Sequence, residues 1–281
     1  MPELPEVETV RRGLAPVLEG RRFKRVIIKR AGLRFPFPKG FTGRLEGAKV
    51  VELKRRGKFL LAPMNSGETL IMHLGMSGRF SIFKDGVPPP EGPHDHVVFE
   101  TDGGVTVRYW DPRRFGCMDL AVSSTLHTHP MLARLGPEPL SAEFDGPLLA
   151  ALLKGRTTAV KTAIMDQSVI AGMGNIYASE SLFRAGISPK RKAGNVFGRR
   201  AGRLARSIVD VLDEAIASGG STLRDHRLPS GEAGYFQHRF AVYGRQGEAC
   251  PGCDCDPGKT GGIGRIKQGG RATFYCARRQ R

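Results

Sequence analysis

The sequence contains no uninterrupted apolar run near the roughly 18 residues that a membrane-spanning helix needs. No signal peptide is visible either, because charged residues begin at Glu3 and no apolar segment follows them. Cysteine is scarce, with five in 281 residues, and so few thiols in a cytosolic chain argue against a disulfide framework. We therefore predict a cytoplasmic protein that does not bind a membrane.

Acidic residues are missing from two stretches, residues 188–207 and 261–281, although the chain holds 27 of them. The 44 lysines and arginines give a net charge of +17. Basic side chains cluster in those stretches: Lys190, Arg191, Lys192, Arg199, Arg200, Arg203, Arg206, Arg265, Lys267, Arg271, Arg278, Arg279 and Arg281. One such run is explained by a solvated face of the protein, but two of them indicate a polyanionic partner. We favour nucleic acid over an anionic membrane as that partner.

With 281 residues, 40% of them hydrophobic, the chain is long enough for a globular protein with two cores. Between residues 22 and 120, short apolar runs are separated by Gly, Pro and Asp, a pattern typical of an antiparallel sandwich or barrel. The runs are Val26–Ile28, Val50–Leu53, Phe59–Leu61, Thr69–Met72, Phe80–Phe83, His96–Phe99 and Val105–Tyr109.

The composition changes at residues 135–148, where Gly, Pro and acidic residues predict a linker. Beyond it, apolar residues recur at helical spacing in Leu148–Leu153 and Leu204–Ile216, and Gly219 and Gly220 end the second helix. We predict an α+β multidomain protein. Its parts are an N-terminal antiparallel β-sandwich with flanking helices at 1–134, the linker at 135–148, a helical domain at 149–238 and a metal-binding hairpin at 239–281.

The N-terminus carries a possible nucleophile. Removal of Met1, expected ahead of a small residue, would leave Pro2 with a secondary amine whose reference pKa is about 8, against about 10.4 for lysine. The apolar spacing of Val7–Leu18 predicts a helix directly after it, and the positive helix end favours the carboxylates of Glu3 and Glu6 over an ammonium. A weakly basic amine beside an acid can attack an electrophilic carbon and form an iminium. A processed N-terminus on the surface is the ordinary alternative.

Three polar stretches between the predicted strands differ from ordinary turns. Lys58 follows a basic run at the mouth of an apolar strand, where partial desolvation would lower its pKa. Met76 lies in a Gly-rich turn, where it would be exposed, and Arg113 and Phe115 follow an Asp-Pro turn. Apolar side chains can wedge between base pairs and an arginine can bind a base edge, so these loops predict a nucleic-acid contact.

His94 and His96 have i, i+2 spacing on a predicted strand and therefore share a face. A metal site is one interpretation. No third ligand is evident nearby, so we favour a phosphate contact.

Two glycines precede the helix predicted at Ile176–Ala185, for which Asn175 is a good N-cap. Because glycine lets the backbone approach a ligand closely at a positive helix end, we predict a bound phosphate with Lys161 or Arg156 as counter-charge. From these residues alone, a plain helix-turn-helix of the core is equally open. Residues 219–238 lack a clear period and form either a lid over a bound base or a connector.

Four of the five cysteines lie near the C-terminus. Cys250 and Cys253 form a metal knuckle, and a strand-like run leads to Cys276, the outline of a zinc ribbon. Zinc would stabilise a hairpin too small to fold alone and would hold Arg271 at its tip. Cys117 is most simply a small buried hydrophobe.

Taken together, these motifs resemble the formamidopyrimidine-DNA glycosylase family, bacterial enzymes that remove oxidised purines from DNA. The resemblance covers essentially the whole chain and favours this family over endonuclease VIII, in which glycine usually follows Glu3, whereas here Leu4 does. Six ordered motifs carry it: residues 2–9, the Lys58 segment, His73–Gly78, Asp111–Gly116, Asp166–Glu180 and the terminal cysteines. It implies a helix-two-turn-helix within the helical domain and a zinc-finger hairpin after it.

The resemblance also implies roles. Pro2 would attack C1′ of the damaged nucleotide, Glu3 would act as acid at the sugar ring, and Glu6 would support the site. Lys58 and Arg271 would transfer protons during β- and then δ-elimination. The residues implied to contact DNA are Met76, Arg113 and Phe115, which would fill the gap left by the extruded base, Lys161 and Asn175 on phosphates, and His94.

One departure concerns the metal site. The family's ribbon has two Cys-x-x-Cys pairs at a shorter spacing than that between Cys253 and Cys276, and Arg279 stands where the fourth cysteine is expected. Cys255 is the obvious substitute. The predicted site for one structural zinc is therefore Cys250, Cys253, Cys255 and Cys276.

We predict a bifunctional DNA glycosylase and abasic-site lyase of base excision repair, a monomer that acts on oxidised purines in duplex DNA. A non-catalytic zinc-ribbon DNA-binding protein, or a family member that has lost its activity, is the second possibility, and retained Met1 would favour it because the secondary amine would not exist. A third keeps the chemistry and changes the substrate to oxidised pyrimidines.

Overall fold

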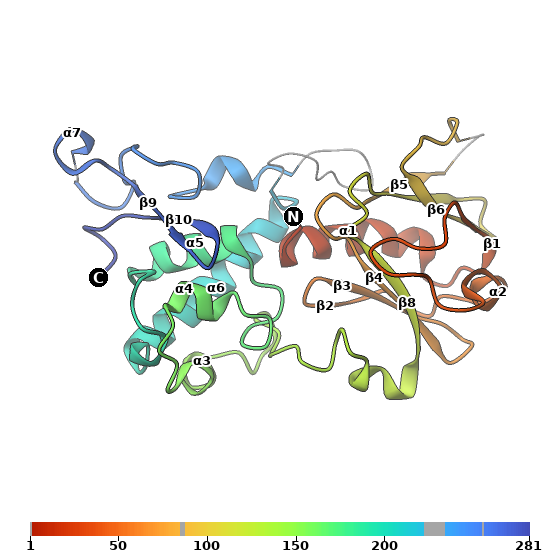
Figure 1. Cartoon of the computed structure of the whole chain (residues 1–281), viewed down its shortest axis with the longest axis horizontal. Coiled ribbons are helices and arrows are strands. Elements are labelled where there is room, and N and C mark those ends of the chain that lie inside the picture. Colours follow the sequence, from red (N-terminus) through yellow and green to blue (C-terminus); the bar gives the residue numbers. More distant parts are fainter. Residues whose placement is uncertain (1, 85–87, 222–233, 255) are drawn as a thin grey trace. The chain divides into compact units, whose positions relative to one another are not determined.

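A computed structural model describes residues 2–84, 88–221, 234–254 and 256–281 (Figure 1). The chain divides into two compact units. The first unit holds Met1–Ala133 and Ser218–Tyr235, and the second holds Arg134–Ala217 and Phe236–Arg281. None of the helices in the described ranges is both long and apolar enough to cross a membrane.

Two four-stranded antiparallel sheets build the first unit, with strand orders β1-β6-β7-β5 and β2-β3-β4-β8. The first sheet contains β1 (Phe23–Ile28), β5 (Arg79–Phe83), β6 (Asp95–Thr101) and β7 (Thr106–Trp110). The second contains β2 (Lys54–Arg56), β3 (Phe59–Pro63), β4 (Glu68–His73) and β8 (Cys117–Val122). Apolar side chains from both sheets form one core, which confirms the predicted sandwich.

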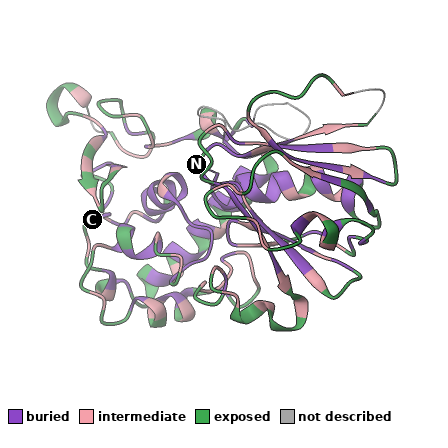
Figure 2. Ribbon diagram, turned by 45° about the vertical axis from the view of Figure 1, so that its right-hand side comes forward, coloured by how far each residue is buried: buried purple, intermediate pink, exposed green. Residues whose placement is uncertain are grey.

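The N-terminal helix α1 (Leu4–Leu18) belongs to the same core (Figure 2). Pro5 lies in its first turn, where a missing backbone donor costs nothing. Val7, Val10 and Leu14 are almost completely buried, at helical spacing as predicted. The start of the chain is therefore anchored inside a folded unit. The short helices α2 (Phe41–Leu45) and η1 (Ser123–Thr128) complete the unit.

Some strands differ from the prediction. The apolar run Val50–Leu53 is not a strand, because Val50 makes only an isolated bridge to Met64. β2 consists of basic residues and β8 is interrupted by Asp119, so neither forms an apolar run that the sequence pattern could show.

The second unit is mainly helical. Its elements are α3 (Gly146–Leu153), α4 (Val160–Ile164), α5 (Asn175–Ala185), η2 (Ala193–Asn195), α6 (Arg199–Ala217), η3 (Phe236–Arg239), α7 (Pro257–Thr260), β9 (Gly264–Gln268) and β10 (Arg271–Tyr275). α3 begins inside the predicted linker, where the Asp145 carboxylate accepts a hydrogen bond from Leu148 N at 2.8 Å. α6 contains the predicted helix Leu204–Ile216.

The ends of α5 show why one prediction was wrong by a residue. Asn175 was predicted as the N-cap, but Gly174 is the N-cap and Asn175 is the first helical residue. The Asn175 side chain therefore does not cap the helix. Gly186 ends the helix in the left-handed conformation, with φ of 67°.

β9 and β10 pair antiparallel around a tight turn at Gly269 and Gly270, both with positive φ. The predicted hairpin is present. A small cluster of buried residues stabilises it: Phe183, Val242, Cys250, Ile263 and Cys276.

Candidate active site and nucleic-acid interface

The predicted nucleophile lies at a fixed position in the first unit. Pro2 is buried, directly before α1, and Glu3 is 3% exposed. The backbone N–H of Glu3 donates to Glu6 Oε2 at 2.9 Å, as in a capping box. Glu6 Oε1 accepts from both the backbone N–H and the hydroxyl of Ser221, at 2.8 and 2.9 Å. The Pro2–Glu3 peptide group is thus held by a buried carboxylate that is itself anchored.

Lys58 lies in the turn between β2 and β3 and is 7% exposed, as its entry into an apolar strand predicts. Gly57 has a positive φ of 56°, which the tight turn requires. The Arg55 guanidinium at the base of this hairpin donates to Glu8 of α1 at 3.2 Å and to the Gly57 carbonyl at 3.1 Å. These bonds connect the Lys58 turn to the helix that follows Pro2.

Glu8 is the charged centre of that connection. Burial opposes its ionisation, but hydrogen bonds from Arg11 and Arg12 outweigh this and lower the pKa of Glu8. A buried carboxylate with three arginine partners stays charged and keeps the hairpin against α1.

His73, the first residue of the His73–Gly78 motif, lies at this site, although no role for it was predicted. It pairs with Phe59, next to Lys58, and their rings are 4.8 Å apart. Burial, then the charges of Lys58 and Arg34, lower the pKa of His73 from 6.5 to about 4. The imidazole is therefore neutral at physiological pH, and its Nδ1 accepts from Gly75 N at 3.0 Å. The register between β3 and β4 brings His73 beside Lys58, and the sequence pattern did not predict that pairing.

The two predicted wedge loops lie against each other. Gly75 packs on the backbone of Phe115 and Gly116 so closely that a Cβ would lie 2.3 Å from the Phe115 carbonyl carbon. Met76 and Phe115 are 37% and 44% exposed, large values for apolar side chains. The Arg113 guanidinium lies 4.9 Å from the centre of the Phe115 ring. An exposed methionine, aromatic ring and arginine are thus presented by adjoining loops.

One buried carboxylate fixes both loops. Asp111 has no exposed surface, and it accepts from Ser77 Oγ at 2.6 Å in the first loop and from Gly116 N at 2.8 Å in the second. The Tyr109 hydroxyl donates to it at 3.3 Å. Burial and the neighbouring Asp111 raise the pKa of Tyr109, so the phenol stays protonated and remains a donor.

His94 and His96 are close, with ring centres 6.3 Å apart, but they differ in environment. His96 is buried and its Nε2 bonds the Asp111 carbonyl at 2.9 Å, while His94 packs edge-on against Trp110. The metal interpretation gains no support, because neither histidine belongs to a potential metal-ligand group among the described residues.

In the second unit, Lys161 and Asn175 form a direct pair. Lys161 has no exposed surface, and its ammonium donates to the Asn175 side-chain oxygen. The Asn175 amide donates to the Ala272 carbonyl at 3.0 Å, one residue after Arg271. Arg271 is exposed at the tip of the hairpin, as predicted. Lys161 of α4 and Asn175 of α5 therefore meet beside the backbone of β10, next to Arg271 in the chain.

Arg156, the alternative counter-charge, has another partner. Its guanidinium lies 3.5 Å from the Asp166 carboxylate and donates to the Leu152 carbonyl at 3.0 Å.

Glu180 has a structural role that was not predicted from the sequence. This buried carboxylate of α5 accepts from three consecutive backbone N–H groups, Ala241, Val242 and Tyr243, at 2.8 to 3.0 Å. It fixes the segment that leads to the cysteine hairpin. The partners are more than sixty residues away in sequence, and no local pattern reveals them.

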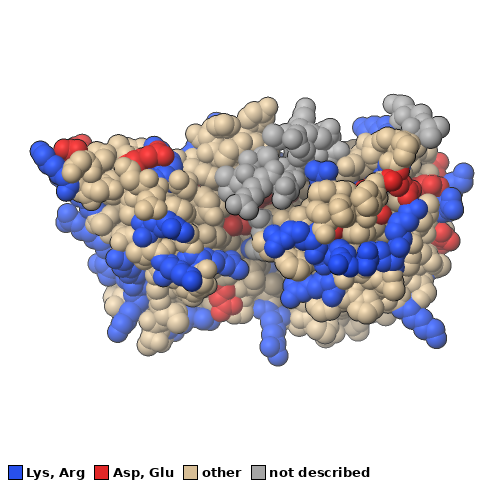
Figure 3. All heavy atoms as spheres, turned by 45° about the horizontal axis from the view of Figure 1, so that its top comes forward, with Lys and Arg blue, Asp and Glu red and all other residues tan. Residues whose placement is uncertain are grey.

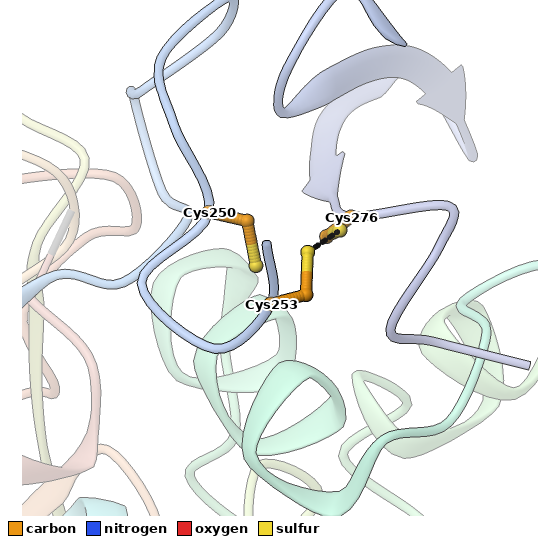
Figure 4. A group of neighbouring side chains, drawn as sticks. All are labelled: Cys250, Cys253 and Cys276. Carbon is orange, nitrogen blue, oxygen red and sulfur yellow. Dashed lines mark hydrogen bonds between the residues drawn. The ribbon is translucent and has the colours of Figure 1, made fainter. Parts of the chain in front are cut away.

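Three of the four predicted metal ligands converge (Figure 4). The sulfur atoms of Cys250, Cys253 and Cys276 all lie within 4.8 Å of one another, and the last two are 3.6 Å apart. Burial raises the pKa of the Cys250 thiol to about 12. Three converging sulfurs fit a soft or borderline cation, which would hold the thiolate form. Cys255 lies outside the described residues.

Arg279, at the position expected for a fourth cysteine, bridges the knuckle to α5. Its guanidinium donates to the Gly252 carbonyl at 2.8 Å and to the Phe183 carbonyl at 3.4 Å, and it lies over the Phe183 ring. The side chain stabilises the knuckle but offers no metal ligand.

Basic side chains clearly outnumber acidic ones on the face drawn in Figure 3. Such a surface suits a polyanion.

Comparison with known proteins gives a consistent result. The family model described as the formamidopyrimidine-DNA glycosylase N-terminal domain matches residues 1–118, and the model of the H2TH domain of the same enzyme matches residues 135–227. The protein of that name from Rhodospirillum centenum is 57% identical over 291 residues, and that from Rhodospirillum rubrum is 56% identical over 281 residues, each with 100% of both chains covered.

Solved structures agree. The MutM (Fpg) protein of Thermus thermophilus is 40% identical with a TM-score of 0.85, covering 99% of this chain and 98% of that one. A Lactococcus lactis Fpg variant in complex with a Fapy-dG containing DNA is 31% identical with a TM-score of 0.88, and 99% of both chains is covered.

The β-sandwich, the helical unit with its cysteine hairpin and these similarities define a DNA glycosylase. The chain belongs to the formamidopyrimidine-DNA glycosylase family.

Proposed function

We propose that the protein excises oxidised purines, 8-oxoguanine and formamidopyrimidines, from duplex DNA and then cleaves the abasic strand through a Schiff base on Pro2. The observation that carries the proposal is the Glu6 carboxylate, which holds the Pro2–Glu3 peptide group by a 2.9 Å bond within a buried N-terminus. Relatives that carry the name of the family, and a relative solved with Fapy-dG containing DNA, support the substrate class.

The chemistry begins after removal of Met1. The Pro2 nitrogen attacks C1′ as the bond from C1′ to the damaged base breaks, and the proton that the nitrogen then loses leaves with the base. Glu3 then protonates the ring oxygen, the sugar ring opens, and the nitrogen lone pair forms an iminium with C1′. The iminium acidifies the C2′–H bond, so the 3′ phosphate leaves by β-elimination and the 5′ phosphate by δ-elimination. We assign proton transfer in these steps to Lys58 and Arg271.

The same proposal assigns a role in DNA binding to the exposed loop residues. Met76 and Phe115 would fill the space left by the extruded nucleotide, and Arg113 would bind the opposite base. The rigid support from Asp111 favours this role, because a wedge must keep its position against the stacking energy of the duplex. His94 would contact the backbone.

We assign phosphate binding to the second unit. Lys161 and Asn175 would bind a phosphate at the start of α5, with Arg156 as a weaker contributor because Asp166 already neutralises part of its charge. We assign one structural zinc to Cys250, Cys253 and Cys276, with Cys255 as the proposed fourth ligand. The metal would stabilise the hairpin that carries Arg271 and take no part in the reaction.

Borohydride reduction tests this function directly. Incubation with a duplex that contains 8-oxoguanine and then with borohydride should give a covalent protein–DNA adduct, and a thymine-glycol duplex should give less. The reverse preference would assign oxidised pyrimidines as substrate. If no adduct forms and the purified protein retains Met1, the chain binds DNA without catalysis. The monomeric state and cytoplasmic location remain predictions.

A further inference from the structure

A groove on the second unit has no place in the reaction. It runs between the start of α3 and the first turns of α6, with a volume of about 580 Å³. Its lining is mostly apolar and small: Phe144, Pro147, Ala150, Gly202, Ala205 and Val209. Of the elements that carry predicted site residues, α1, α4, α5 and β10 contribute nothing to it.

The groove stays open because of two glycines. A Cβ on Gly146 would lie 2.7 Å from the Gly202 Cα, so only glycine lets α3 and α6 approach this closely. A Cβ on Gly202, in contrast, would meet nothing within 4 Å. The Gly202 side of α6 therefore faces free space, and glycine inside a helix is less favourable than alanine.

One end of the groove is strongly basic. It continues into a second depression lined by Phe197 and by four arginines, Arg199, Arg200, Arg203 and Arg206. In the part of the chain that the structure describes, no carboxylate forms an ion pair with any of these guanidinium groups. Phe197 is 62% exposed, among the most exposed large apolar side chains of the described residues.

These arginines lie where a helix is least tolerant of positive charge. They occupy the first turns of α6, and no acidic residue lies in the first turn. Cations near a helix N-terminus are unfavourable because they face the positive end of the helix dipole. A negatively charged partner would remove this cost.

The groove also contains acids. Asp145 and Asp210 belong to its lining, and neither lines the arginine depression. These two carboxylates would repel a nucleic-acid backbone that extended along the groove, whereas the arginine depression would attract an anion. An anionic group is therefore attracted to the arginine depression and not to the groove itself, whose apolar floor suits aliphatic or aromatic side chains.

We propose that this groove binds a peptide segment of a partner protein that carries acidic residues at one end and apolar side chains beside them. The acidic end would lie on Arg199 and Arg203, an apolar side chain would pack against Phe197, and the remaining apolar residues would occupy the floor at Gly202. The surface is a recruitment site, independent of the proposed reaction.

The test uses the full-length protein and a random peptide library displayed on phage, with selection in excess duplex DNA to occupy the nucleic-acid interface. Enriched peptides should carry clustered Asp or Glu next to Leu, Phe or Ile. A fluorescein-labelled copy of the most enriched peptide then measures affinity by anisotropy. Enrichment of peptides without acidic residues would overturn the proposal.

Three variants locate the site. Gly202→Leu fills the groove and improves helix propensity, so it should abolish peptide binding without loss of thermal stability. Arg199→Glu combined with Arg203→Glu should weaken binding at least about tenfold. The exposed Lys259→Glu, outside the groove, is the matched charge-reversal control and should bind as wild type.

Two results would contradict the proposal. One is equal peptide affinity in wild type and in both groove variants. The other is loss of affinity for undamaged duplex DNA in the Arg199→Glu and Arg203→Glu double variant with unchanged peptide binding, which would assign the basic end to nucleic acid. The Gly202→Leu variant should cleave lesion-containing DNA at the wild-type rate, whether or not it binds the peptide.

Discussion

Glu6 and Ser221 are joined by two hydrogen bonds across 215 positions of the sequence. The Glu6 Oε1 atom accepts from the Ser221 backbone N–H at 2.8 Å and from its hydroxyl at 2.9 Å. The other carboxylate oxygen holds the N–H of Glu3. A single buried side chain therefore determines how the residues around the proposed nucleophile are placed.

Glu6→Gln should damage this arrangement with little change in size. One carboxylate oxygen becomes an NH2 group that faces an N–H donor, and an unsatisfied buried donor costs about 1–3 kcal/mol. We expect the free energy of unfolding to fall by about 2 kcal/mol and borohydride trapping to slow. Urea unfolding and single-turnover trapping measure the two effects.

Ser221→Ala is the matched control for Glu6→Gln. It removes the hydroxyl bond and keeps the backbone bond, so its effect should be about half as large. If Glu6→Gln unfolds and traps like wild type, the carboxylate does not position the N-terminus.

Asp111→Asn should loosen the two wedge loops together. The amide cannot accept from both Ser77 and Gly116 in the present geometry, and a lost buried bond to a charged group costs about 1.5–3 kcal/mol. Affinity for a duplex with a tetrahydrofuran abasic analogue should fall by about tenfold.

Asp102→Asn, at an exposed turn of the same unit, controls for the loss of a charge. Anisotropy of the labelled duplex gives both affinities. Wild-type binding by Asp111→Asn would show that loop rigidity does not contribute to recognition.

Much of the fold is readable from the sequence because the relevant signals are local. The helical spacing of Val7, Val10 and Leu14 predicts α1, and glycines at 186 and 219 mark helix ends. β2 was missed because its residues are basic, and their strand conformation depends on pairing with β3. Val50 was assigned to a strand because its run is apolar. In the structure its side chain is buried in the core, and its backbone makes only an isolated bridge.

The sequence predicts which residues belong to the proposed site, but not how they are arranged in space. Pro2, Lys58 and the cysteines can be selected by chemical type and spacing. The bonds from Ser221 to Glu6 and the roles of Asp111, His73 and Glu180 depend on contacts between distant positions, and no local pattern encodes these. The predicted role of Cys255 and the lid within 219–238 fall largely on residues outside the described ranges and stay predictions.

His73 should make stability depend on pH in the acid range. Its pKa is lowered from 6.5 to about 4 in the folded protein, so on acidification the unfolded chain binds a proton before the folded one. Stability from this group is therefore complete above pH 6.5 and lost as the pH falls toward 4. Between pH 7 and pH 5 the loss is about 2 kcal/mol.

His73→Asn keeps an acceptor for Gly75 N and removes the titration. Urea unfolding at both pH values should show a loss smaller by about 2 kcal/mol in the variant than in wild type. Equal pH dependence in the two proteins would contradict the low pKa of His73.

Loss of the metal should affect the cysteine hairpin before the sandwich. Cys276→Ser should purify without the metal that we expect in wild type, lose affinity for lesion-containing duplex, and unfold at a lower temperature in the second unit. Cys117→Ser is the matched control, because Cys117 is buried in the first unit and burial raises its pKa to about 11. Elemental analysis by mass spectrometry counts the metal.

Cys255→Ser tests the proposed fourth ligand in the same assay. A reduced metal affinity would support it, and an unchanged affinity and stoichiometry would remove Cys255 from the ligand set. If wild type and Cys276→Ser hold the same metal, the cluster of three thiols is not the binding site.

The most direct measurement concerns the Pro2 nitrogen. After borohydride reduction on 8-oxoguanine duplex and digestion with nuclease and trypsin, mass spectrometry should find the deoxyribose-derived adduct on the peptide that begins at Pro2, with Met1 absent. A fully active enzyme whose adduct maps to Lys58 or to any other lysine, or one whose Pro2 nitrogen is acetylated without loss of strand cleavage, would contradict the account.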